Sequence, residues 1–71
     1  MPQFIKAPVA GTVLKVQIEE GVRVTGGQVG VIIDSSQGQT PVEIPAPGFV
    51  SVVHCSEGAP VHEGDLLVTL D

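Results

Sequence analysis

The chain has 71 residues, of which 42% are hydrophobic and only 3% aromatic, so its length suits one small domain with an aliphatic core. Eight acidic residues against three basic ones give a formal charge of -5, which excludes the basic surface of a nucleic-acid-binding protein and attraction to anionic membranes. No apolar run approaches the roughly 20 residues of a membrane span, and the first residues do not resemble a signal peptide. The single cysteine permits no internal disulfide, so we expect a cytoplasmic protein.

The beginning of the chain predicts short β-strands separated by a break. Pro8 and Gly11 interrupt strand pairing, because proline lacks a backbone donor and glycine weakens an extended segment. On either side of this break, apolar residues recur at every second position, which is typical of strands with one face in the core. The predicted inward residues here are Ile5, Ala7, Leu14, Val16 and Ile18. Lys15 and Gln17 are expected to face water.

Two turns and a closing strand complete the first half of the chain. Residues 19–21 and 25–27 contain glycine and polar residues and are predicted to form turns, with Val24 between them facing inward. The closing strand is predicted to direct Val29, Val31 and Ile33 into the core. Acidic residues in these turns are expected to keep a small apolar-rich domain soluble.

The middle of the chain, residues 34–41, predicts a projecting hairpin. This polar segment lies between two apolar runs and contains Gly38, which tolerates the positive φ that tight turns require. Ser35, Ser36 and Thr40 would act as nucleophiles only beside a positioned base, which the segment lacks. Their hydroxyl groups are therefore interpreted as turn-forming groups that bond nearby backbone.

The second half of the chain repeats the first after a shift of 37 residues. Matched pairs in this register include Pro8/Pro45, Gly11/Gly48, Val13/Val50, Gly21/Gly58, Val24/Val61, Gly27/Gly64, Val31/Val68 and Asp34/Asp71. We interpret residues 1–71 as one domain with half-repeats at about 5–34 and 42–71, joined by a hairpin at 35–41. The predicted inward residues of the second half are Val42, Ile44, Val53, Cys55, Val61, Leu66, Val68 and Leu70.

The predicted fold class is all-β. No stretch shows the 3.6-residue apolar period of a helix, and glycine or proline recurs throughout. Alternating apolar residues in both halves predict a flattened β-barrel or sandwich of two quasi-symmetric four-stranded halves. The internal repeat then places the hairpin at one end of the molecule and both termini at the other.

Several short motifs together resemble the biotinyl/lipoyl carrier domain family, in particular biotin carboxyl carriers. Residues 7–13 and 20–24 are similar to the first half of that domain, and residues 45–50, 57–61 and 63–65 to the second. The resemblance covers about Ile5 to Asp71. It implies a biotinyl/lipoyl-like barrel-sandwich hybrid whose central hairpin presents one lysine for acylation by biotin or lipoate.

The resemblance fails at the attachment position. Counting from the matched glycines places the family's lysine at Gln37, and an alternative alignment of the following segment places it at Gln39. The hairpin tip is predicted at Ser35, Ser36, Gln37 and Gly38, with Ser36 and Gly38 where biotin carriers have methionines. A glutamine amide cannot accept an acyl group, so no cofactor is expected. Lys6 and Lys15 are predicted on strands away from this tip.

The remaining reactive side chains do not form a predicted catalytic or metal site. Cys55 shares an inward face with Val53 and is interpreted as a small core residue. His54 is adjacent to Cys55 on a strand, so the two side chains point to opposite faces and cannot chelate one metal. His62 is expected in a solvated turn. Neither histidine has a basic residue nearby in the sequence that would support its acceptance of a phosphate group.

Three functional hypotheses remain open at this point. The first is a non-catalytic docking or structural module with no modifiable lysine, related to a carboxylase, decarboxylase or 2-oxoacid dehydrogenase assembly and binding subunits of that type. In it, the hairpin tip and acidic turns would form the recognition surface of a monomer or weak oligomer. The second is a biotin or lipoate swinging-arm carrier with an altered attachment site. The third is the lipoyl-like segment of a larger protein such as a membrane-fusion adaptor, which the short central connection disfavours.

Overall fold

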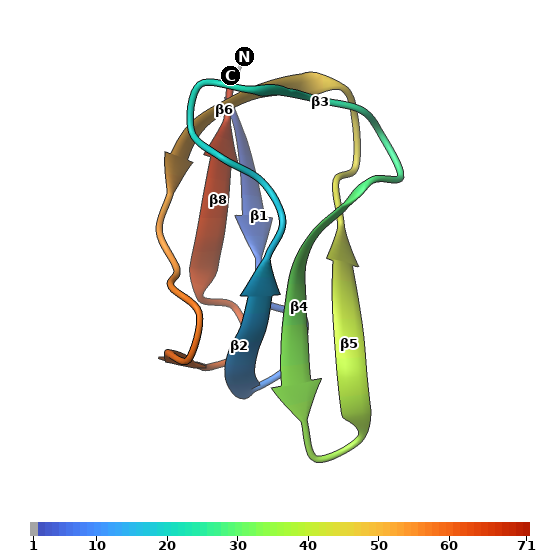
Figure 1. The fold of residues 1–71 in the computed structure, drawn as a ribbon, viewed down its shortest axis with the longest axis vertical. Helices are drawn as coiled ribbons and strands as arrows, with labels where there is room; N and C mark the ends of the chain where they lie inside the picture. The colour runs from blue at the N-terminus through green and yellow to red at the C-terminus, as the bar shows by residue number, and fades with distance from the viewer. Residues whose placement is uncertain (1) are drawn as a thin grey trace.

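The computed structural model describes residues 2–71, which form eight β-strands (Figure 1) and, within this range, no helix that could cross a membrane. The strands are β1 (Gln3–Lys6), β2 (Gly11–Val16), β3 (Arg23–Val24), β4 (Val29–Ser35), β5 (Gly38–Glu43), β6 (Gly48–Val53), β7 (Pro60–Val61) and β8 (Leu66–Leu70). They form two four-stranded antiparallel sheets with the orders β1-β8-β6-β3 and β5-β4-β2-β7. The predicted all-β fold class is confirmed.

The two sheets are built from equivalent strands of the two halves. Exchanging β1 with β5, β2 with β6, β3 with β7 and β4 with β8 converts one sheet order into the other. The pairing repeats residue by residue: Ile5 lies opposite Val68, and Val42 lies opposite Val31, each 37 residues earlier or later. Each sheet therefore contains two strands from each half, so both halves are needed to complete either sheet.

A β-bulge in β2 overturns one predicted core position. The pairing of β2 with β4 passes from Val13–Ile33 directly to Lys15–Ile32, so Leu14 is an extra residue in β2. The inward side chain is consequently Val13, which is 1% exposed, whereas Leu14 is 42% exposed. The prediction that Leu14 faces inward was wrong, because an extra residue reverses the alternation of faces.

A second bulge, in β8, corrects another predicted core position. The pairing of β1 with β8 passes from Ile5–Val68 to Lys6–Leu66, which leaves Leu67 as the extra residue. Leu67 is fully buried, and Leu66, predicted to face inward, is 37% exposed. Apolar residues at both positions made the two alternations indistinguishable from the sequence.

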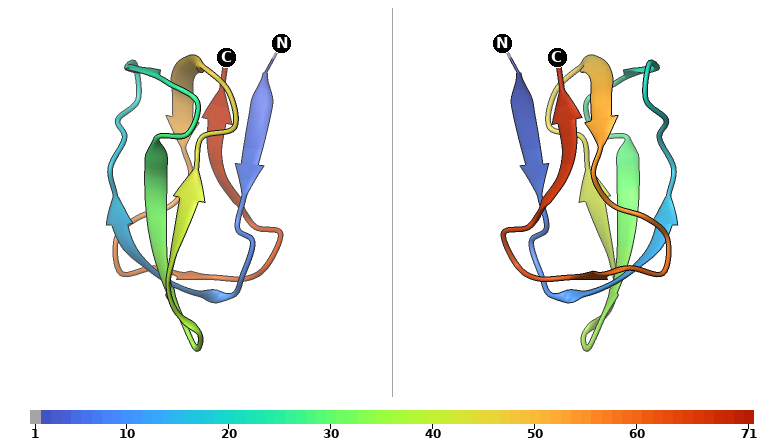
Figure 2. Two further views of the ribbon diagram at one scale, coloured as in Figure 1. Left: turned by 90° about the vertical axis from the view of Figure 1, so that its right-hand side faces the viewer. Right: turned by 90° about the vertical axis from the view of Figure 1, so that its left-hand side faces the viewer.

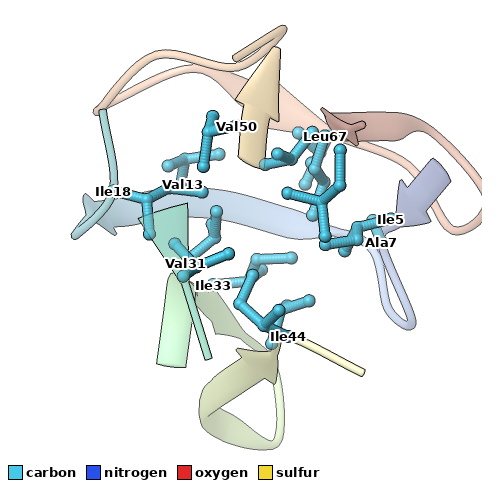
Figure 3. Close-up of a cluster of buried hydrophobic side chains, with 14 residues drawn as sticks. Ile5, Ala7, Val13, Ile18, Val31, Ile33, Ile44, Val50 and Leu67 are labelled. Atoms are coloured by element: carbon cyan, nitrogen blue, oxygen red, sulfur yellow. The ribbon is translucent and has the colours of Figure 1, made fainter. Parts of the chain in front are cut away.

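The core between the sheets is aliphatic and contains side chains from both halves (Figure 3). At Gly30, the position equivalent to Leu67, an added Cβ would lie 3.0 Å from Ile44 Cδ1 and 3.4 Å from Ile18 Cδ1. The larger Ile18 and Ile44 thus occupy the space beside Gly30. Their counterparts in the repeat are the smaller Cys55 and Ala7, whereas Leu67 is larger than Gly30. Large and small residues are exchanged between the halves, which lets one backbone pattern fill both ends of the core.

Two glutamates complete the sheets beyond their shortest strands. β3 and β7 contain two residues each, so parts of the neighbouring strands have no strand beside them. Glu57 Oε2 accepts a hydrogen bond from the backbone N–H of Val16 (N···O 3.1 Å), and Glu20 Oε2 accepts one from Val53 (2.9 Å). We predicted only that acidic residues in these turns aid solubility or form a recognition surface, although the equivalent positions of Glu20 and Glu57 in the repeat are visible in the sequence. Each glutamate links the two halves.

The β4–β5 hairpin and the outer ends of β1 and β8 lie at opposite ends of the molecule (Figures 1 and 2). Gln3 and Leu70 are paired at the end away from the hairpin. The hairpin therefore projects from the two-sheet body, as the internal repeat predicted.

Candidate functional site

The hairpin tip is shorter than the predicted connection at 35–41. β4 and β5 remain paired as far as Ser35 opposite Gly38, which leaves Ser36 and Gln37 as the two turn residues. Gln39 lies within β5, opposite Asp34. The structure thus places Gln37 at the turn and Gln39 in the strand ladder.

Ser35 and Gly38 close this turn. The Ser35 hydroxyl donates a hydrogen bond to the Gly38 carbonyl (3.0 Å), and its oxygen accepts one from the backbone N–H of Gln37 (3.2 Å). Gly38 has a φ of 104°, whereas no non-glycine residue in the described chain has a positive φ. Ser36 and Gln37 therefore turn the chain with negative φ, and Gly38 completes the reversal. The predicted turn role of Ser35 agrees with these two bonds.

The tip presents neutral polar groups. Ser36, Gln37 and Gly38 are exposed, and Ser35 is half-buried. Their side chains offer hydroxyl and amide groups and no primary amine. Asp34 is the nearest ionisable residue in the sequence, but no hydrogen bond joins its side chain to a hydroxyl within residues 2–71. Within residues 34–38, the arrangement supports turn formation and places no hydrogen-bonded base beside a hydroxyl group.

Both lysines lie in strands. Lys6 is opposite Leu66 in the pairing of β1 with β8, and Lys15 is opposite Ile32 in the pairing of β2 with β4. Both side chains are exposed. Each amine is therefore carried by a strand and not by the turn at Ser36 and Gln37.

Cys55 and the histidines have separate environments. Cys55 is half-buried against the core, and desolvation raises the pKa of its thiol above the ordinary value of 9.0. His54 Nε2 lies 2.9 Å from Thr69 Oγ1, whereas His62 Nδ1 lies 3.7 Å from Asp65 Oδ2 in a turn where its side chain is 86% exposed. Within residues 2–71, no three His, Cys, Asp or Glu side chains converge as a metal site would require.

A known protein family matches nearly the whole chain. The family model described as "Biotin-requiring enzyme", the biotin/lipoyl family, matches residues 1–70. The chain belongs to the biotin/lipoyl family. This biotin/lipoyl domain is 36% identical over 70 residues to pyruvate carboxylase of Bacillus subtilis (strain 168), covering 99% of this chain. It spans only 6% of that carboxylase.

Two further relatives are close to this biotin/lipoyl domain in size. The biotinylated protein TB7.3 homolog of Mycobacterium leprae (strain TN) is 31% identical over 70 residues, covering 99% of both chains. The solution structure of the lipoyl domain of the 2-oxoglutarate dehydrogenase complex from Azotobacter vinelandii superposes with a TM-score of 0.81. That domain is 28% identical, and the match covers 96% of this chain and 94% of the lipoyl domain.

Proposed function

We propose that this biotin/lipoyl domain is not acylated at its hairpin and acts as a non-catalytic docking module of a carboxylase-type assembly. The observation that carries the proposal is the identity of the turn residues: Ser36 and Gln37 occupy the tip, and neither supplies a primary amine. Transfer of a biotinyl or lipoyl group to a domain forms an amide with a lysine ε-amine. A glutamine amide is too weak a nucleophile to replace that amine.

The position of Gln37 supports its equivalence to the attachment residue. Gln37 lies at the turn, whereas Gln39, the alternative candidate, lies in the β5 ladder opposite Asp34. An acceptor amine must reach the active site of a ligase, which favours the projecting turn over a strand position. Lys6 and Lys15 are exposed but lie in strands, so neither presents its amine at a projecting turn.

The relatives support the proposed carboxylase context. The chain is similar over 99% of its length to a small part of pyruvate carboxylase and to a small protein described as biotinylated. A domain with this fold and without an acceptor amine can still contact other proteins through its surface. Docking is therefore the function that remains when acylation is removed.

Intact-mass measurement tests the proposal directly. The chain is co-expressed with a biotin ligase and, separately, with a lipoate ligase, and the purified product is weighed by mass spectrometry. The Mycobacterium leprae biotinylated protein, treated with the biotin ligase, serves as the positive control. We expect the unmodified mass from both expressions of this chain. An added biotinyl or lipoyl group would refute the proposal and establish the swinging-arm carrier in its place.

A further inference from the structure

Four strands form the edges of the two sheets, and three of these edges are protected against pairing with another chain. β3 and β7 are only two residues long, and Glu20 and Glu57 bond the backbone N–H groups beyond them. β5 contains Pro41, which has no backbone donor. β1 has neither feature: Gln3–Lys6 contains no proline, and no strand of the described chain covers its outer side (Figure 2).

The unpaired backbone groups of β1 belong to Phe4 and Lys6. The Ala7 N–H donates to the Asp65 carbonyl, and the Ala7 carbonyl accepts from the Gly64 N–H, each at 2.8 Å. Ala7 thus directs its polar groups toward the β8 side. Because these groups alternate in direction along an extended strand, those of Phe4 and Lys6 point to the free edge. One donor and one acceptor on each residue are available there.

The other half of the repeat shows the same backbone with one outward donor removed. Ile44 donates to the Gln28 carbonyl at 2.7 Å and accepts from the Gly27 N–H at 2.8 Å, as Ala7 does in its own half. By the same alternation, Pro41 and Glu43 face outward on β5. Pro41 is the counterpart of Phe4 in the repeat. The outward position that lacks a backbone N–H on β5 therefore has one on β1.

The side chains of β1 give this edge an apolar and a basic position on one face. Phe4 is 59% exposed and lies opposite Thr69, which lies opposite the exposed Val52 on β6. Ile5 between Phe4 and Lys6 is buried, so Phe4 and Lys6 share the outer face. Proline occupies the equivalent of Phe4 in the other half, which shows that the fold itself does not require an exposed aromatic residue there.

We propose that the free edge of β1 binds an extended segment of a partner protein as an additional strand. The segment carries an acidic residue beside Lys6 and an apolar residue beside Phe4, two positions apart, because side chains on one face of a strand are separated by two residues. A second copy of this chain pairing through its own β1 is disfavoured, since Gln3–Lys6 contains no acidic residue to place beside Lys6. The inference rests on the proposed docking function, but it is tested at β1, while acylation is tested at the hairpin.

Titration of the isotopically labelled chain with synthetic peptides, followed by NMR, tests this edge. The probe is a capped peptide of about ten residues with alternating Thr and Val, in which Glu and Leu replace two Thr residues two positions apart. A matched peptide carries Lys in place of Glu. We expect the Glu peptide to shift the β1 amide resonances and to slow hydrogen exchange of the Phe4 and Lys6 amides. We expect the Lys peptide to bind at least about tenfold more weakly.

Two substitutions distinguish strand pairing at β1 from non-specific binding of the peptide. Phe4→Pro copies the native Pro41 and removes one outward donor, so it should abolish peptide binding while the remaining amide spectrum shows a folded protein. Lys6→Glu should reverse the preference between the Glu and Lys peptides and needs no change in the backbone. The proposal is overturned if millimolar Glu peptide leaves β1 unshifted, if the peptide contacts the hairpin instead, or if sedimentation shows that β1 pairs with a second copy.

Discussion

At the residue scale, the exposed turn of Ser36 and Gln37 lacks the primary amine that acylation requires. Gln37→Lys would place a primary amine at the exposed turn, and we expect a biotin ligase to acylate it, detected by intact mass. Gly38→Met is not included, although biotin carriers resemble Met there, because a φ of 104° would strain any side chain at that position.

Gln39→Lys is the matched control for this variant. Its amine would extend from β5 opposite Asp34, and we expect the chain to keep its unmodified mass. Labelling of Gln39→Lys without labelling of Gln37→Lys would show that the alternative alignment identifies the attachment position. A folded Gln37→Lys chain that no ligase modifies would show that the surface around the hairpin has also diverged.

Cys55 provides a second prediction for a single residue. Burial raises the pKa of its thiol in the folded chain above the ordinary 9.0, so the unfolded chain loses this proton first as the pH rises. The free energy of unfolding should therefore fall above about pH 9 more steeply in the native chain than in Cys55→Ala, as measured by urea unfolding. Equal pH dependence of the two chains would contradict the burial of this thiol.

At the scale of strands, we expect the hydrogen bonds of Glu20 and Glu57 beyond β3 and β7 to contribute to the free energy of unfolding. Glu20→Ala removes the acceptor for the Val53 N–H, and we expect a loss of about 0.5–1.5 kcal/mol in the free energy of unfolding. Glu57→Ala should behave alike, because its bond to Val16 is the equivalent one. Glu19→Ala is the control, since the Glu19 side chain makes no hydrogen bond within residues 2–71. Urea unfolding measures the free energy of unfolding of all three variants, and losses equal to that of Glu19→Ala would contradict the role of the two bonds.

The bulge residue of β8 gives a prediction about packing. Leu67 is fully buried, so Leu67→Gly should lower the free energy of unfolding by about 2–5 kcal/mol or more, the range for large-to-small changes in a core. Adding Ala7→Ile and Cys55→Ile reproduces the Gly30, Ile44 and Ile18 arrangement of the other half. The triple variant should regain part of the lost stability in thermal or urea unfolding. A further loss would show that the two ends of the core are not interchangeable.

At the scale of the whole molecule, the sequence predicted the fold class because its apolar alternation and turn glycines agree along both halves. It could not locate the bulges, since Leu14 and Leu66 are apolar neighbours of the residues that enter the core. It predicted a hairpin in the right place but gave it too long a connection, because Gln39 and Thr40 are polar residues that extend β5. The open edge of β1 was invisible, since it depends on which strands are neighbours in space.

Gln3 pairs with Leu70 at the end away from the hairpin, so the two halves could be joined there in the opposite order along the chain. A short glycine-rich peptide could join the two ends, because paired antiparallel residues lie about 5 Å apart. A new start at Gln37 would then require no strand to move. Such a circular permutant should give the same amide spectrum outside the joined and opened turns and unfold in a single transition. A collapsed, poorly dispersed spectrum would show that the original β4–β5 connection is needed for folding.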